Sequence, residues 1–230
     1  MTTNESFPKF DLPVDFIADD SITGDILNYY GNFPCKIKAG VFMLCTEGMV
    51  RATINLLEIV IRKNDFIVVL PNSFIQIHEV SSDTRISFAG FSSDFMLSGN
   101  YVEILLDFMP MILNSPVISL QEDVAGLYRN VYLLLIRAYT LPHSLENKEI
   151  IRSVLAIFLQ GTKELYKRYG KKLDEPLRRE QELYRQFIQL LMVHYTKEHE
   201  VAFYAEKCGV TAAHFSSAIR RASGYSPLAI

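Results

Sequence analysis

The stretch VAFYAEKCGVTAAHFSSAIRR, residues 201–221, has the pattern of two short helices joined by a tight turn. The first helix is expected to end at Gly209. Thr211 can cap the second helix, because its side-chain oxygen would accept a hydrogen bond from a free backbone N–H of the first turn. Phe215 and Ile219 are four residues apart and therefore share one helix face. Two short helices joined by a turn of three or four residues with a glycine predict a helix-turn-helix.

The composition is that of a chain able to build a packed core. Of its 230 residues, 49% are apolar and 21% are charged, which excludes intrinsic disorder by composition. The net charge of −3 is unevenly distributed. Residues 171–230 carry nine Lys/Arg and seven Asp/Glu, a net charge of +2, so the remainder carries −5. This asymmetry has the sign expected for an acidic sensor joined to a module that faces DNA.

The cysteines and the N-terminus indicate a cytoplasmic protein. Three widely spaced cysteines, without a CxxC or Cys/His pattern, predict free thiols in a reducing compartment and no bound metal or other cofactor. The polar N-terminal residues lack the apolar core of a secretion signal. No apolar run approaches the ~20 residues that a membrane helix needs. We therefore expect no association with a membrane.

Residues 36–92 predict β-structure throughout. They are rich in β-branched and aromatic residues, and turn signals divide them into short segments. Several short strands at this spacing predict a barrel or jelly roll. The predicted strands are Ile37–Thr46, Val50–Asn55, Glu58–Arg62, Phe66–Leu70, Phe74–Val80 and Arg85–Ser92. The run Asn55-Leu56-Leu57 occupies a turn in which leucine is unfavourable, so a longer loop or a bulge is expected there.

The pattern becomes helical after residue 93. In residues 120–139, apolar side chains recur at spacings of three and four residues, namely Val124, Leu127, Val131, Leu134 and Ala138. Two interpretations of this stripe stay open. It could pair with a second copy of the chain in an antiparallel dimer, or the helix could lie against its own barrel. A second long helix is predicted over residues 146–169.

The run GKKLDEP, residues 170–176, has the composition of a linker between domains. It is charged, it begins with a glycine suited to ending a helix, and it closes with a proline suited to the first turn of the next helix. A helix over Leu177–Tyr195 would follow it and pack against the helix-turn-helix.

Residues 201–207, Val210-Thr211, Phe215-Ser216 and the run SGYSP at 223–227 together resemble the first helix-turn-helix of AraC/XylS transcription regulators, in the form found in Bacteroidetes-type sequences. Upstream, FMLCTEG at 42–48 and NDFIVVLPN at 64–72 resemble the cupin barrel that many such regulators carry as an effector-sensing domain.

This resemblance implies a domain organisation for the whole chain. Residues 1–170 would form a cupin-like sensing and dimerisation domain, with a barrel at about 14–92 and helices at about 99–170. Residues 171–177 would be the linker. Residues 178–230 would form the first half of the DNA-binding domain, with its helix-turn-helix at 201–222. The family's second helix-turn-helix, which full-affinity binding requires, is absent from the sequence.

The second helix of a helix-turn-helix enters the major groove of DNA. The family resemblance places base contacts on Ala213, Ser216 and Ser217, whose small side chains offer modest base readout. Arg220 and Arg221 would bind phosphates and contribute affinity without sequence choice. The alternative for these two arginines is a solvated surface without a DNA contact.

Enzyme activity is not expected. The chain lacks glycine-rich phosphate loops, Gly-x-Ser-x-Gly and His-Glu-x-x-His motifs. His78 is the only histidine in the barrel segment, whereas metal-dependent cupin enzymes use several. His78 could bond to an effector or serve a structural role.

The residues and the resemblance together predict an α+β chain that acts as a DNA-binding transcription regulator. It would respond to an unidentified small-molecule effector bound in the N-terminal barrel, and it would form a homodimer through helix 120–139. The alternative is a truncated sensor and dimerisation module without DNA binding of its own. A cupin enzyme is the third class considered.

Overall fold

The computed structural model describes residues 9–25, 27, 34–55, 57–97, 108–109, 111–140, 148–169, 179–194, 197–223 and 226–229. The chain divides into two compact units, Met1–Gly170 and Lys171–Ile230, which are treated one at a time. The predicted linker at 171–177 and the residues 99–107 of the predicted helical part lie outside the described residues. The predicted α+β fold is confirmed, with an antiparallel cupin-like β-sandwich followed by helices.

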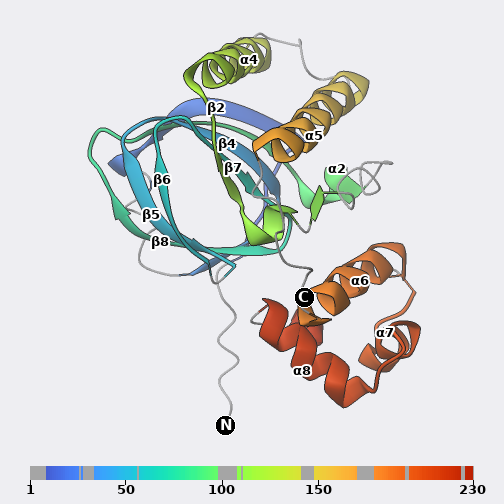
Figure 1. Cartoon of the computed structure of the whole chain (residues 1–230). Coiled ribbons are helices and arrows are strands. Elements are labelled where there is room, and N and C mark those ends of the chain that lie inside the picture. The colour runs from blue at the N-terminus through green and yellow to red at the C-terminus, as the bar shows by residue number, and fades with distance from the viewer. Residues whose placement is uncertain are drawn as a thin grey trace. The chain divides into compact units, whose positions relative to one another are not determined.

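The first unit is built on two five-stranded sheets that pack face to face (Figure 1). One sheet has the order β1 (Lys9–Phe10), β3 (Cys35–Ile37), β8 (Ser73–Val80), β5 (Met49–Ile54) and β6 (Leu57–Arg62). The other has the order β10 (Val117–Ser119), β7 (Asp65–Val69), β4 (Gly40–Glu47), β9 (Arg85–Phe91) and β2 (Phe16–Thr23). All pairings between neighbours are antiparallel except the short one between β1 and β3. We call these the β8 sheet and the β4 sheet after their central strands.

The alternating side chains of β4 separate two different cores. Phe42 and Leu44 are fully buried on the face that meets the helices, whereas Val41, Met43 and Cys45 point toward the β8 sheet. The core between the sheets is aliphatic. The layer beneath the helices is aromatic, with ring contacts that include Phe42–Phe158 at 5.3 Å between centroids.

The turn between β5 and β6 corrects one expectation. The longer loop or bulge expected at Asn55-Leu56-Leu57 is wrong, because β5 and β6 stay paired up to Ile54 and Leu57. Asn55 adopts the positive φ of 47°, a conformation that asparagine tolerates far better than leucine. Its side-chain oxygen also accepts a 2.9 Å hydrogen bond from the N–H of Phe74 on β8, which holds the turn in place.

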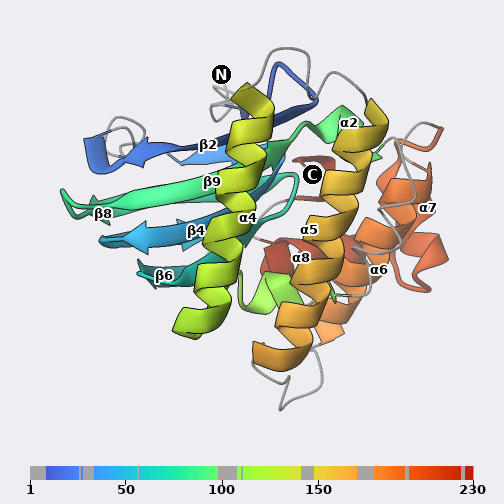
Figure 2. The ribbon, with the colours of Figure 1, turned by 90° about the horizontal axis from the view of Figure 1, so that it is seen from above.

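Three helices with described bounds come after β9 in the first unit, and β10 lies between the first and the second of them. The short helix α2 (Ser93–Leu97) comes directly after β9. The long helices α4 (Glu122–Thr140) and α5 (Lys148–Tyr169) lie side by side across the outer face of the β4 sheet (Figure 2). The predicted helices at 120–139 and 146–169 are therefore present.

Helix α4 lies against its own sandwich, as one of the two interpretations of its apolar stripe predicted. It packs on β2, β4 and β9 and buries Ala125, Tyr132 and Leu135. The Tyr132 ring contacts the Phe158 ring of α5 at 5.5 Å between centroids. This buried set is not the stripe singled out in the sequence, because Leu134 of that stripe is 68% exposed.

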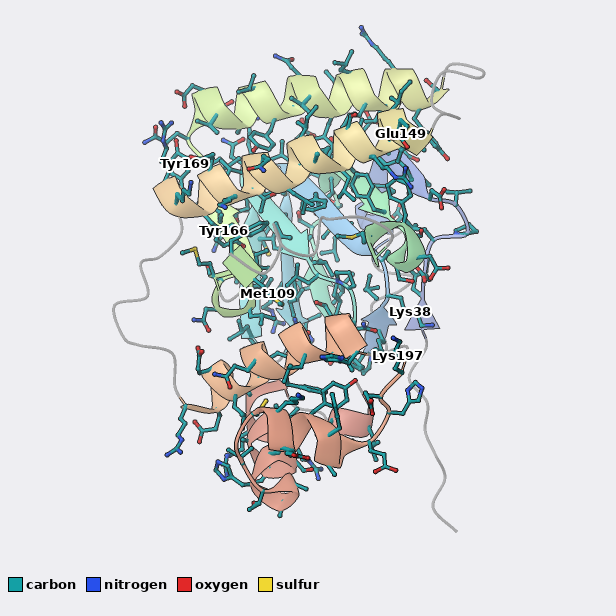
Figure 3. All side chains as sticks on the ribbon, turned by 90° about the vertical axis from the view of Figure 1, so that its right-hand side faces the viewer. Lys38, Met109, Glu149, Tyr166, Tyr169 and Lys197 are labelled. Atoms are coloured by element: carbon teal, nitrogen blue, oxygen red, sulfur yellow. The ribbon has the colours of Figure 1, made fainter. Side chains whose placement is uncertain are left out.

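Polar contacts fix the ends of both long helices to the sandwich. Asn64, in the β6–β7 turn, donates to the Glu122 carboxylate of α4 at 2.5 Å and accepts from Arg129 at 2.9 Å. These hydrogen bonds from Asn64 and Arg129 lower the pKa of the Glu122 carboxyl. On α5, the Tyr166 hydroxyl donates to the backbone carbonyl of Ser115 at 2.6 Å, near the Tyr169 end of the helix (Figure 3).

The second unit contains α6 (Arg179–His194), α7 (Val201–Lys207), α8 (Ala212–Ser223) and the 3₁₀ turn η1 (Pro227–Ala229). Its core combines residues from all three α-helices, namely Leu183, Phe187, Tyr204, Ala205, Phe215, Ala218 and Ile219. Phe187 of α6 is central, with ring centroids 5.4 Å from Tyr204 and 5.1 Å from Phe215. None of the helices described in either unit is long and apolar enough to cross a membrane.

Candidate functional site

The turn between α7 and α8 is closed by backbone hydrogen bonds. Val210 N–H donates to the carbonyl of Ala205 at 3.0 Å, and Gly209 N–H donates to the carbonyl of Glu206 at 2.9 Å. Gly209 has a φ of +68°. This pair of bonds around a left-handed glycine is the Schellman arrangement that ends helices. Ala205 and Val210 both belong to the core of the unit, so the turn is also held by packing.

Thr211 caps α8 as the sequence predicted. Its side-chain oxygen accepts from the N–H of His214 at 3.3 Å, and its carbonyl accepts from the N–H of Phe215 at 2.8 Å. Phe215 and Ile219 are fully buried, in agreement with the predicted inner face. The two helices and their four-residue turn have the connectivity of a helix-turn-helix.

The residues predicted to contact DNA lie on the outer side of α8. Ala213, Ser217, Arg220 and Arg221 are exposed, and Ser216 is partly buried. This face presents small side chains along its early turns and cationic side chains in its last turn. A surface of this kind allows close approach to a neighbouring polyanion and adds positive charge at one end.

The two arginines differ in their surroundings. Arg221 contacts the Glu180 carboxylate of α6 at 3.6 Å and donates to the Ser217 hydroxyl at 3.2 Å. The pairing with Glu180 has no local sequence signal, because the two residues are 41 positions apart. Arg221 is therefore tied to its own unit, and Arg220 is the better candidate for an external anion.

A second candidate site lies between the two sheets of the first unit. Val41 and Met43 of β4 and Ile75 and Ile77 of β8 point into this space but are only partly buried. Cross-strand register places these side chains on the inward faces, since Met43 pairs with the fully buried Ile67.

Burial between the two sheets differs from residue to residue, on central and edge strands alike. Ile67 and Val69 of β7, which neighbours β4, are fully buried, as are Ala52 and Ile54 of β5, which neighbours β8. Cys45 of β4 is fully buried as well, whereas Val41, Met43, Ile75 and Ile77 keep part of their apolar surface uncovered. Sequence reasoning named no residue here, although the alternation along β4 identifies its two faces.

This inner surface is aliphatic at its centre. Phe88, which pairs with Met43, adds an aromatic ring that is also partly buried. The carboxylates on the same face lie at its margins. Asp19 is on the edge strand β2, and Asp65 begins β7, where it accepts from the Ser119 hydroxyl at 2.6 Å. Such a surface can bind an apolar body and leaves polar groups only at its rim.

His78 lies outside this inner surface. Its side chain is exposed, and its Nε2 is 2.7 Å from the Thr53 hydroxyl on the neighbouring strand β5. Thr53 alternates with the inward-facing Ala52 and Ile54, so both polar groups are on the outer face of the β8 sheet. This position favours the structural role over contact with an effector between the sheets.

The described residues support neither a metal site nor a reactive thiol. In that part of the chain no three His, Cys, Asp or Glu side chains are grouped so that they could hold a metal ion. Burial, with a smaller contribution from Asp65, raises the pKa of the Cys45 thiol to about 12. A thiol of that pKa stays protonated at neutral pH, so Cys45 acts as a core side chain.

Neither a protein-family model nor a curated protein matches the sequence. Among solved structures, ToxT from Vibrio cholerae, bound to (E)-4-(8-methylnaphthalen-1-yl)but-3-enoic acid, is 11% identical, with 96% of this chain and 94% of that chain covered and a TM-score of 0.33. The AraC-like transcriptional activator CuxR is 10% identical, with 82% and 62% covered and a TM-score of 0.42. The Escherichia coli ribosomal oxygenase YcfD matches at 13% identity, with 68% and 45% covered and a TM-score of 0.23. In structure, the chain resembles AraC-like regulators.

Proposed function

We propose that the protein is a cytoplasmic, homodimeric transcription regulator, without enzyme activity, that binds DNA through α8. The observation that carries this proposal is the construction of α8. A glycine turn and a threonine cap fix the helix, and its outer face combines Ala213, Ser216 and Ser217 with a cationic last turn. Small side chains let the helix approach the bases closely, and Arg220, the arginine without the Glu180 contact, binds a phosphate.

The arginines allow a direct test with a fluorescent DNA duplex at several salt concentrations. Arg220→Ala should weaken binding to all sequences alike and reduce the slope of log K against log salt by about 0.9, the value for one phosphate contact. Arg179→Ala is the matched control, because it removes the same charge from an exposed position on α6. Equal effects of the two variants, or a change of base preference with Arg220→Ala, would contradict the proposed contact.

We propose further that the effector is an apolar molecule bound between the two sheets. The support is the partly buried aliphatic surface of β4 and β8, whose completion by an apolar ligand would bury Met43 and Ile77. Each Å² of apolar surface removed from water contributes about 25 cal/mol. Polar groups of the ligand would remain at the rim, in contact with solvent.

A thermal-shift comparison tests the effector class, because a ligand that binds only the native state raises its apparent stability. We expect 1-decanol or decanoate, below their micellar range, to raise the melting temperature, and glucose or arabinose to leave it unchanged. Ile77→Thr should raise the dissociation constant of the alkyl ligand roughly tenfold. The matched control, Val60→Thr, changes an outward side chain that is 43% exposed and should have no effect. Stabilisation by the sugars alone would overturn this choice of effector.

A further inference from the structure

Two hydroxyl groups beneath the long helices of the first unit are buried without a hydrogen-bond partner among the described residues. They are the Tyr132 Oη of α4 and the Thr162 Oγ1 of α5, and both side chains are fully buried. A buried hydroxyl is unfavourable unless another group replaces the water it has lost, so folded proteins pair nearly all such groups with protein or with ordered water. We propose that these two hydroxyls bind one buried water molecule, which bridges α4 to α5.

The two hydroxyls come from facing positions on antiparallel helices, which lie side by side in Figure 2. The Tyr132 ring centroid is 5.5 Å from that of Phe158, and a Cβ atom added to Gly161 would lie 2.7 Å from the Tyr128 hydroxyl oxygen. One turn toward the start of α4 therefore corresponds to one turn toward the end of α5. Thr162 directly follows Gly161, so it lies at the level of Tyr128, about one turn from Tyr132.

The direction of the Tyr132 side chain brings its hydroxyl toward Thr162. Long side chains of a helix lean toward the N-terminus of that helix, so the Tyr132 hydroxyl points toward the level of Tyr128. Burial raises the pKa of Tyr132, and the nearby Tyr128 raises it further, which shows that the two phenol groups are neighbours. Thr162 is on the same inner face of α5 as Phe158, four residues earlier. The Tyr132 and Thr162 hydroxyls therefore face the same space between the helices and the β4 sheet.

Gly161 allows a third hydroxyl to reach this space. A glycine in the interior of a helix is unfavourable compared with alanine, so its presence within α5 indicates a packing reason. A side chain at this position would collide with the Tyr128 hydroxyl, which approaches the α5 backbone beside Thr162. Buried water molecules typically bond to about three polar groups, the number of hydroxyls at this level.

The surroundings select a small neutral molecule. The Phe66 ring is 5.2 Å from the Tyr128 ring, and the layer is otherwise apolar. An ion would lose its hydration here without an opposite charge. Burial raises the pKa of Tyr128 to about 12, so this phenol stays protonated at neutral pH and can both donate and accept. Water can accept from the Tyr132 hydroxyl and donate to the Thr162 hydroxyl, which satisfies both groups with one molecule.

This water site is separate from the proposed effector surface. It lies on the helix-covered face of the β4 sheet, whereas Met43 and Ile77 point into the space between the two sheets. The inference therefore goes beyond the proposed function and does not depend on DNA or effector binding. A hydrogen-bonded bridge is directional, so it would fix how α4 and α5 align in a layer that apolar contacts alone hold less specifically.

A double-mutant cycle in chemical denaturation tests the bridge. Tyr132→Phe and Thr162→Val each remove one hydroxyl with little change of shape, so both variants should fold. Each should raise the equilibrium constant for unfolding roughly fivefold, because the water and the remaining hydroxyl lose a bond. The double variant should be no less stable than either single variant, since it removes both hydroxyls together. Tyr139→Phe is the matched control, because it removes a hydroxyl from an exposed position of the same helix and should change nothing.

The opposite pattern would overturn the inference. Unpaired hydroxyls in a layer without water are each unfavourable, so both single variants would then stabilise the protein and their effects would add. A high-resolution crystal structure gives an independent readout. We expect one ordered water within about 3.2 Å of both hydroxyl oxygens, and its loss in the double variant. A direct hydrogen bond between Tyr132 and Thr162, or no ordered water beside them, would also contradict the bridge.

Discussion

Helices α4 and α8 are alike on their inner sides and unlike on their outer sides. α4 buries Tyr132 and Leu135 against a sheet, and α8 buries Phe215 and Ile219 against two other helices. Outside, α4 presents leucines and α8 presents alanine, serine and arginine. The inner side of a helix establishes that it folds in place, and the outer side establishes what it can contact. Apolar side chains suit another protein surface, whereas small and cationic side chains suit a polyanion.

The largest effect is expected from the inner side of α8. Phe215→Ala removes a fully buried ring that contacts Phe187, and it should cost the second unit about 3–5 kcal/mol of stability. Chemical denaturation followed by circular dichroism measures this loss. Ser217→Ala, on the exposed side of the same helix, should stay within about 0.5 kcal/mol of the wild type. A small effect of Phe215→Ala would show that the inner side does not hold α8 in place.

The next effect concerns the outer side of α4. Leu134→Asp places a charge on the exposed face of α4, the helix expected to form the homodimer, and should raise the dimer dissociation constant by roughly 30-fold or more, equivalent to about 2 kcal/mol. Its unfolding transition should hardly change at dilutions where both proteins are monomeric, because Leu134 is exposed. Sedimentation equilibrium provides the measurement. Leu228→Asp is the control, since Leu228 is 79% exposed on η1. If Leu134→Asp leaves the dimer intact, the comparison of the outer faces fails.

The third prediction concerns the loss of folding stability at high pH that is caused by Tyr128, on the inner side of α4. Burial raises the pKa of Tyr128 to about 12, above the ordinary value near 10. The unfolded chain therefore loses this proton first, and stability falls as the pH rises from about 10 to 12. At pH 11 the loss from Tyr128 should be on the order of 1 kcal/mol. Urea unfolding of Tyr128→Phe between pH 9 and 11 should show a shallower decline than the wild type. If the stability of both proteins falls equally with pH, Tyr128 does not contribute to the decline.

The smallest effect is expected at the start of α8. Thr211→Ala removes the side-chain oxygen that accepts from His214, and it should cost about 1 kcal/mol. Thr211→Ser keeps the oxygen and should lie close to the wild type in the same denaturation experiment. A loss shared by both variants would assign the effect to the threonine methyl group instead of the cap.

Local chemistry explains which parts of the fold were predictable. The end of α7 and the cap of α8 depend on Gly209 and Thr211, whose preferences act within a few residues. The tight turn at Asn55 was not predicted, because leucine is unfavourable in such turns, whereas in the structure Asn55 takes the left-handed conformation. The tie between Arg221 and Glu180 could not be predicted, since it joins residues that only the packing of α6 and α8 brings together.

The apolar stripe of α4 shows the limit of sequence periodicity. Spacing identified a helix with Leu127 and Leu134 on one face, yet the sandwich covers the neighbouring face that carries Tyr132 and Leu135. Both faces contain apolar side chains, so periodicity could not choose between them. The choice depended on aromatic partners from distant strands and α5, such as Phe158.

By itself, the sequence determined the α+β order of strands and helices, the helix-turn-helix and the residues on the outer side of α8. These properties follow from backbone preferences and from the periods of strands and helices, which act locally. Only the tertiary structure decided which face of α4 stays open, which arginine is tied to α6, and which inward side chains of the sandwich keep apolar surface uncovered. Each of these depends on surfaces that distant segments cover or leave bare, and burial is a property of the packed chain.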